Sequence, residues 1–143
     1  MSAAVTFCDA LLHAHGSLAR KLDDELGTHH GLALQDFWLL RLLASAPQGL
    51  PEAALARPLG KAPSAVVRQL LPLEKTGLVQ RMPGGGSGGK QVLLCASGRT
   101  LAGEAAVTAD AICAQALRGQ PAAALDTAHA LLQVLGTSPA LEV

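Results

Sequence analysis

Glycine and proline divide the middle of the chain into short segments, and this punctuation restricts the possible folds more than any other feature. Pro51 and Pro63 each stand where the first turn of a helix tolerates proline. Gly60 and Gly77 follow the two segments that these prolines open, and a glycine beyond the last turn typically ends a helix. The pattern therefore predicts two helices joined by a tight turn, over residues 51–59 and 63–76.

A hairpin is predicted directly after the second of these helices. The segments 78–82 and 91–95 have the composition of short strands, and residues 83–89 between them include five glycines. We therefore expect two paired strands with a flexible tip. A short helix, a turn, a longer helix and a hairpin, in this order and at these lengths, are typical of a winged helix-turn-helix.

The segments on either side of this unit are predicted to be helical. Apolar residues recur at helical spacing over residues 5–26, with Gly27 as the expected C-terminal cap and His29-His30 in the polar loop that follows. Further helices are expected over residues 34–44, 97–118 and 121–135. In the first of these three, the side chains expected to face inward are Phe37, Leu40 and Leu43.

Composition supports a mostly helical protein. Of the 143 residues 50% are hydrophobic and only 2% aromatic, so that the core must consist of Leu, Ala and Val. This mixture suits helices packed on helices and argues against an all-β fold. The expected fold class is therefore α+β, mostly α, in one domain over residues 1–143.

The chain shows no sign of export, membrane insertion or cofactor binding. No apolar run approaches the roughly 20 residues that span a bilayer, and the N-terminus lacks a basic leader. The cysteines are odd in number and far apart, at Cys8, Cys95 and Cys113, which fits reduced thiols better than disulfides or a zinc site. The histidines at positions 13, 15, 29 and 30 have no convincing ligand spacing. We expect a cytoplasmic protein that is not an enzyme and holds no metal or cofactor.

Positive charge is concentrated in the predicted winged unit, although the formal net charge of the chain is zero at pH 7. Between Arg57 and Arg99 lie seven Lys and Arg residues against the single acid Glu74, a local excess of six. Such asymmetry is expected where one lobe of a protein faces phosphate and the rest does not. An ordinary solvated face is the alternative interpretation of the charge alone.

The longer helix of the pair has one face for burial and an opposite face for the DNA major groove, which is just wide enough for a helix. Val66, Leu70 and Leu73 form the inward stripe. Arg68 is the candidate reader of base edges, because a guanidinium matches the two acceptors of guanine. The candidate DNA-binding residues are Lys61, Pro63, Ser64, Ala65, Arg68, Gln69, Lys75, Arg81 and Lys90.

The same region carries a two-part family pattern. The first part is an apolar-Ala-x-x-Leu-Gly turn, at Leu55, Ala56, Leu59 and Gly60. The second part is Leu-Glu-x-x-Gly-Leu-Val followed by arginine, at Leu73, Glu74, Gly77, Leu78, Val79 and Arg81. Together with the upstream GLALQDFWLLRLLA and the downstream Ser97-Gly98-Arg99, this pattern resembles the multiple-antibiotic-resistance regulator (MarR) family over nearly the whole chain.

The resemblance implies a homodimer that binds double-stranded DNA and regulates transcription, expected to be a repressor. Dimerisation helices over about 3–27 and 97–137 would interlock, and the winged units over about 34–95 would present their longer helices to successive major grooves of a pseudopalindrome. The resemblance also implies that a small effector, often phenolic or anionic, binds between the dimerisation helices and the winged unit. The residues that match this ligand pocket are Phe7, Leu11, His15, Trp38 and Arg41. The alternative is that Phe7 and Trp38 are core residues and His15 is merely solvated.

Three departures from the family pattern have structural consequences. The wing tip lacks the family's Asp-Arg pair and has only Lys90 at its base, which weakens the case for minor-groove contact. Pro72 lies inside the longer helix, where it deletes one backbone hydrogen bond and is expected to cause a kink. Cys95 replaces a threonine that commonly caps the following helix, and Ser97 is expected to take over as the cap.

Two other functions are alternatives to regulated DNA binding. The glycine-rich wing is compatible with a winged-helix protein-interaction or dimerisation module that has lost DNA binding. A redox-sensing regulator is the third interpretation, because Cys8 resembles a peroxide-sensing cysteine and Cys113 could resolve it. The chain has no tyrosine to activate such a thiolate, so a buried structural thiol at Cys8 is favoured.

Overall fold

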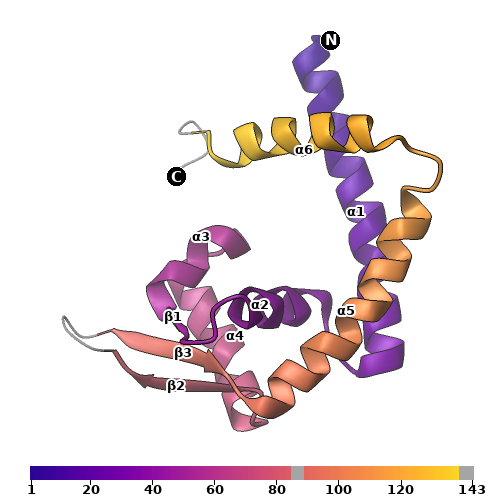
Figure 1. Cartoon of the computed structure of the whole chain (residues 1–143). Helices are drawn as coiled ribbons and strands as arrows, with labels where there is room; N and C mark the ends of the chain where they lie inside the picture. The colour runs from indigo at the N-terminus through magenta and orange to yellow at the C-terminus, as the bar shows by residue number, and fades with distance from the viewer. Residues whose placement is uncertain (85–88, 139–143) are drawn as a thin grey trace. The chain divides into compact units, whose positions relative to one another are not determined.

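The computed structural model describes residues 1–84 and 89–138 (Figure 1). The chain divides into two compact units, Met1–Ile112 and Cys113–Val143. All three strands belong to the first unit, and the described part of the second is helical. The expected fold class, α+β and mostly α with a winged helix-turn-helix, is confirmed.

The first helix, α1 (Ala3–His30), is longer at its C-terminal end than the sequence indicated. Gly27 lies inside it, and the left-handed cap is Gly31, with φ 61°. The N–H of Gly31 donates to the carbonyl of Gly27, and the buried Leu32 N–H reaches the carbonyl of Leu26. The expectations of a cap at Gly27 and of a polar loop at His29-His30 are therefore wrong, because the next glycine takes the cap and both histidines form the last turn.

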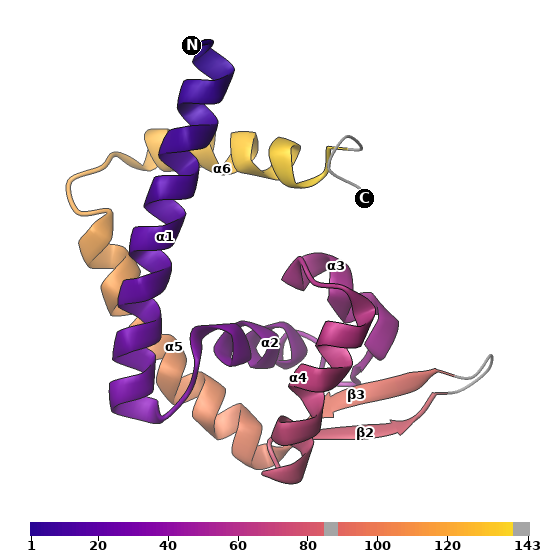
Figure 2. The ribbon, with the colours of Figure 1, turned by 180° about the vertical axis from the view of Figure 1, so that it is seen from behind.

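Helix α2 (Leu34–Ala44) follows at the predicted bounds and supplies much of the core. Its inward residues Phe37, Leu40 and Leu43 are buried as predicted, and Leu39 is buried with them. In Figures 1 and 2 this helix lies between α1 and the helix-turn-helix. The other large side chains that are fully buried are Leu26, Leu55, Val66, Leu70, Val79 and Val92.

The first half of the helix-turn-helix differs from the single short helix expected over residues 51–59. The segment begins as strand β1 (Leu50–Pro51), continues as a 3₁₀ turn, η1 (Glu52–Leu55), and only then forms α3 (Ala56–Leu59). The strand exists because Leu50 and Pro51 pair with Val92 and Gln91, far away in the sequence. Gly49 precedes it with φ 88°, and a Cβ there would lie 2.8 Å from the carbonyl oxygen of Val92.

The second half matches the sequence prediction closely. Gly60, with φ 63°, caps α3, and α4 runs from Pro63 to Lys75 with proline in its first turn. The helix is continuous through Pro72. It ends at the C-cap Thr76, whose N–H donates to the carbonyl of Pro72.

The wing is a three-stranded antiparallel sheet in the order β1-β3-β2. Strands β2 (Val79–Pro83) and β3 (Lys90–Leu94) form the predicted hairpin, in a register that places Arg81 opposite Val92. The hairpin is closed by a hydrogen bond of 2.7 Å from Gly84 N–H to the carbonyl of Gly89. The expected flexible tip, residues 85–88, lies outside the described residues.

Helices α5 (Ala96–Ala116) and α6 (Ala122–Gly136) complete the described chain. Ser97 is not the cap of α5, because the helix already begins at Ala96 and the Ser97 hydroxyl donates to the carbonyl of Gly77 at 2.7 Å. Gly98 is buried against the carbonyl of Leu78, where a Cβ would clash. Neither these helices nor any other in the described ranges is long and apolar enough to cross a membrane.

One ion pair ties the helix-turn-helix to the wing. Nε of Arg81 on β2 lies 2.7 Å from Oε2 of Glu52 on η1, and Nη2 lies 3.2 Å from Oε1. The two side chains are only 11% and 17% exposed. The Glu52 carboxylate raises the pKa of Arg81 by hydrogen bonding to its guanidinium. Glu74 of α4 accepts the Arg81 backbone N–H at 3.0 Å, so that three elements meet at this arginine.

We expect Glu52→Gln to lower the free energy of unfolding by about 1 to 3 kcal/mol, because a largely buried guanidinium then loses its charged partner. Urea denaturation followed by circular dichroism measures this change. The matched control is Glu25→Gln, which breaks the surface pair with the exposed Lys21 and should shift the midpoint much less. Equal shifts for both variants would show that the buried pair does not hold the wing.

Candidate DNA interface and effector cavity

The two faces of α4 differ as the sequence predicts. The inward stripe of Val66, Leu70 and Leu73 is buried, with exposed fractions of 1%, 0% and 5%. Arg68 and Ser64 are exposed on the outer surface, and Ala65 is half-buried beside them. The helix therefore presents a short polar and cationic surface whose position is fixed by the buried side.

Three other candidate DNA-binding residues, Pro63, Lys75 and Lys90, are exposed at the edges of this surface. Pro63 occupies the first turn of α4, and Lys75 its last turn. Lys90 is exposed at the start of β3, where it pairs with Pro83 of β2. Ser64 at the beginning of α4 joins Pro63 near the helix N-terminus, where backbone N–H groups favour a phosphate.

The remaining three candidates make contacts inside the winged unit. Arg81 is held by Glu52, as described above. Lys61 is half-buried, and its ammonium donates to Oε1 of Gln35 at 2.8 Å and to Oε1 of Gln69 at 2.7 Å. Gln69 in turn donates to the Gln35 carbonyl and to the Asp36 carboxylate, each at 3.0 Å. Their side chains thus hold α4 and the wing in place.

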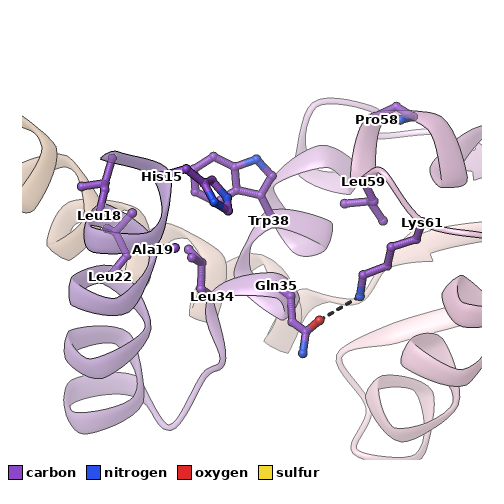
Figure 3. A pocket seen from close by; sticks show the side chains of 10 residues that line it. All are labelled: His15, Leu18, Ala19, Leu22, Leu34, Gln35, Trp38, Pro58, Leu59 and Lys61. Carbon is purple, nitrogen blue, oxygen red and sulfur yellow. Dashed lines mark hydrogen bonds between the residues drawn. The ribbon is translucent and has the colours of Figure 1, made fainter. Parts of the chain in front are cut away.

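A cavity of about 490 Å³ lies between α1, α2 and the turn after α3 (Figure 3). Its wall is mostly apolar, and polar groups stand at its edge. Such a size and lining are typical of sites for small organic ligands. The lining residues are His15, Leu18, Ala19, Leu22, Leu34, Gln35, Trp38, Pro58, Leu59 and Lys61.

Of the five predicted pocket residues, the structure brings His15 and Trp38 into this cavity. Arg41 lies next to it, with its guanidinium 5.7 Å from the centre of the Trp38 ring, and both line a smaller hollow of about 260 Å³. Phe7 and Leu11 line neither cavity. The alternative that Phe7 and Trp38 are core residues is wrong for the single chain, because they are 41% and 42% exposed.

The polar edge of the cavity was not foreseen from the sequence as a unit. The sequence predicts Lys61 on the DNA surface, whereas its side chain points toward Gln35 at the cavity (Figure 3). No sequence pattern marks Gln35 as a site residue. The sequence signal for Lys61 and Gln35 is slight, because polar residues are common in turns and at the start of helices. Only the fold brings the two residues together.

The cysteines are free thiols in the structure. Cys8 is exposed, so the burial expected for it is absent in the single chain, because the N-terminal turns of α1 bury none of their residues. Cys113 is half-buried. Among the described residues, no group of three or more His, Cys, Asp or Glu side chains is arranged to hold a metal ion.

Comparison with family models and solved structures agrees with this geometry. The model of the IclR helix-turn-helix domain matches residues 37–83, from α2 to the end of β2. The chain is similar to a MarR family transcriptional regulator from Rhodococcus sp. RHA1, at 22% identity and a TM-score of 0.85 over 96% of both chains. It is also similar to CouR from Rhodococcus jostii RHA1 bound to p-coumaroyl-CoA, at 23% identity and a TM-score of 0.83 over 91% of both chains.

A higher identity connects the chain to the Mycobacterium tuberculosis MarR family protein Rv2887. Its complex with p-aminosalicylic acid is 32% identical over 90% of this chain and 98% of that one, with a TM-score of 0.66. The same protein also has a structure with salicylic acid. A search of curated proteins found no match.

Identity and fold lead to the same assignment. The shared region includes the two helices and the wing in which the family pattern was found, and it extends through the flanking helices. The family consists of transcriptional regulators rather than enzymes. The chain belongs to the MarR family and is a DNA-binding transcriptional regulator of the winged helix-turn-helix type.

Proposed function

We propose that this regulator is a ligand-responsive repressor that binds a pseudopalindromic operator as a homodimer. Its two compact units would act as one domain over residues 1–143, in the cytoplasm where the chromosome lies. The observation that carries the proposal is the exposed Arg68 on α4, opposite the buried stripe of Val66, Leu70 and Leu73. A dimer would present two such helices to successive major grooves.

Arg68 is the proposed reader of base edges. Ser64 and Ala65 lie on the same outer part of α4 and are proposed to contact the groove with it. Lys75 and Lys90 stand at the edges of this surface and would neutralise phosphates. Lys61, Gln69 and Arg81 are proposed to serve DNA binding indirectly, because their polar groups already have partners within the fold.

Dimerisation is supported by apolar side chains that the single chain leaves uncovered. Helix α6 buries none of its residues, and Val134 is 67% exposed. On α1, Phe7 and Leu12 are 41% and 70% exposed. Exposed apolar side chains of this size are unfavourable in water unless a partner covers them. We therefore propose that α1, α5 and α6 of two chains cover one another.

An effector site is proposed for the cavity between α1, α2 and Lys61. Its volume suits a small aromatic molecule, and Trp38 offers a ring for stacking. Lys61 supplies a positive charge at the edge. The structures of Rv2887 with p-aminosalicylic acid and salicylic acid make an aromatic carboxylate the first class of ligand to test.

The division of DNA contacts between α4 and the wing can be tested by mutation. Arg68→Ala should cost about 1 to 3 kcal/mol of discrimination between operator and random DNA, because it removes a two-pronged base contact. Lys90→Ala should leave discrimination unchanged and reduce the salt slope by about one unit or less, as expected for a single phosphate contact. The measurement is a salt titration of genomic fragments that the purified protein selects, compared with random DNA.

Arg20→Ala on α1 is the control for this titration, because it removes an exposed positive charge away from α4 and the wing. This variant should change neither the discrimination between operator and random DNA nor the salt slope. If Lys90→Ala abolishes discrimination while Arg68→Ala preserves it, the wing reads the sequence and the assignment of Arg68 is wrong. If the wild-type protein selects no DNA, the protein-interaction module is the better interpretation.

The dimer is tested by sedimentation equilibrium at micromolar concentration. We expect about twice the chain mass of 14.6 kDa. Leu131→Glu places a charge on the exposed apolar surface of α6 and should shift the protein toward monomer, whereas Ala53→Glu in η1 should not. A folded wild-type monomer would overturn the proposal.

The cavity is tested by isothermal titration with salicylate. Ala19→Phe should weaken salicylate binding about tenfold or more, because the added ring would occupy the cavity. Ala53→Phe adds the same ring outside the cavity and should bind salicylate like the wild type. Equal binding by all three proteins would place salicylate elsewhere.

A further inference from the structure

Four polar residues connect the cavity to α4, and we refer to them as the Lys61 cluster: Gln35, Asp36, Lys61 and Gln69. The Lys61 ammonium donates at 2.8 Å to the amide oxygen of Gln35 and at 2.7 Å to that of Gln69. Gln69 lies on α4 and does not line the cavity, whereas Lys61 does. One ammonium group therefore contacts both the ligand space and the helix that faces DNA.

The Gln35 and Gln69 oxygens that bind this ammonium are electrically neutral, so that a charged partner could replace them. Both acceptors are neutral amide oxygens, and no ion pair joins Lys61 to a carboxylate within residues 1–84 and 89–138. An ammonium is attracted more strongly to a carboxylate than to a neutral amide oxygen, because the carboxylate carries a full negative charge. The lysine stem has four flexible carbons, so its end can turn without moving the backbone. A carboxylate in the cavity would therefore compete for Lys61.

Loss of the hydrogen bond from Lys61 to Gln69 would weaken the attachment of α4 to α2. The Gln69 amide donates to the Gln35 carbonyl and to the Asp36 carboxylate, each at 3.0 Å, while its oxygen accepts from Lys61. This side chain ties the middle of α4 to the first turn of α2. When Lys61 leaves, the amide oxygen of Gln69 loses its hydrogen-bond donor. The Gln69 amide is then free to rotate away from the Gln35 carbonyl and the Asp36 carboxylate. Arg68 is the residue immediately before Gln69 on this helix.

We propose that Lys61 is the residue through which a ligand carboxylate in the cavity weakens DNA binding, by leaving Gln69 and so releasing α4 from α2. The inference rests on the proposed function of the cavity and of α4. Coupling of this kind is reciprocal, so DNA that fixes α4 would also hold Lys61 in the cluster and weaken ligand binding by the same factor. Lys61 is thus a positioning residue for α4 and a contact residue for the ligand.

The first test needs no ligand. Lys61→Met and Gln69→Met should each lower affinity for the selected DNA about fivefold or more, and the double variant should lose no more than either single one, because both break one interaction. Their salt slopes should equal that of the wild type. Lys61→Arg should retain most of the affinity, because a guanidinium can also donate to two amide oxygens. Thermal unfolding of each variant shows whether it is folded.

The second test compares salicylate with the neutral salicylamide. Salicylate should weaken DNA binding by the wild type about fivefold or more, and salicylamide should have little effect. Lys61→Met should bind salicylate less tightly. Gln69→Met should bind it within about threefold of the wild type, because Gln69 does not line the cavity, yet its DNA affinity should no longer respond.

Each contrary result has a defined meaning. Additive losses in the double variant, with a salt slope reduced by about one in Lys61→Met, would make Lys61 a phosphate contact and overturn the inference. It is also overturned if Gln69→Met still responds fully to salicylate, if salicylamide acts like salicylate, or if DNA-binding wild-type protein ignores salicylate. If the wild type binds no DNA, the proposed function itself fails.

Discussion

Burial of the inner stripe of α4 is the constraint on which the rest of the structure depends. Val66, Leu70 and Leu73 are no more than 5% exposed, and burying each such side chain stabilises the fold by about 1.5 to 3 kcal/mol. Because a helix repeats every 3.6 residues, this burial also fixes the outward direction of Arg68. The hydrophobic core therefore sets the orientation of the DNA-facing surface, while the ion pair between Glu52 and Arg81 joins η1 to the wing.

Sequence reasoning succeeded where local rules decide the structure. Helix α2 and the start of α4 follow from apolar periodicity and from proline in the first turn, and the hairpin follows from its run of glycines. It failed at the end of α1, where Gly27 and Gly31 are both possible caps and contacts of Leu32 with the core favour the later one. It also missed β1, because a two-residue strand is defined by its partners on β3.

The candidate site was predictable only where a local sequence pattern or the family resemblance marks its residues. Arg68 could be assigned to the outer surface because its helix has a clear period, and Trp38 and His15 followed from the family resemblance. Phe7 could not be excluded in advance, since no local pattern shows which turns of α1 face the cavity. The positions of Lys61 and Gln69 depend on how α2 packs beside α4, which no local pattern encodes.

The hydrogen bond that closes the wing hairpin between Gly84 and Gly89 separates the loop at the tip from the paired strands below it. The length of the loop could therefore change in evolution without moving the strands. Below this hydrogen bond, β2 and β3 are fixed by their pairing with each other and by the pairing of β3 with β1. Residues inserted beyond it would lengthen the loop at a small entropic cost, since each doubling of a loop adds only about 0.6 kcal/mol. A lineage could thus acquire or lose contacts to the minor groove at this loop while the helix that reads the major groove keeps its place.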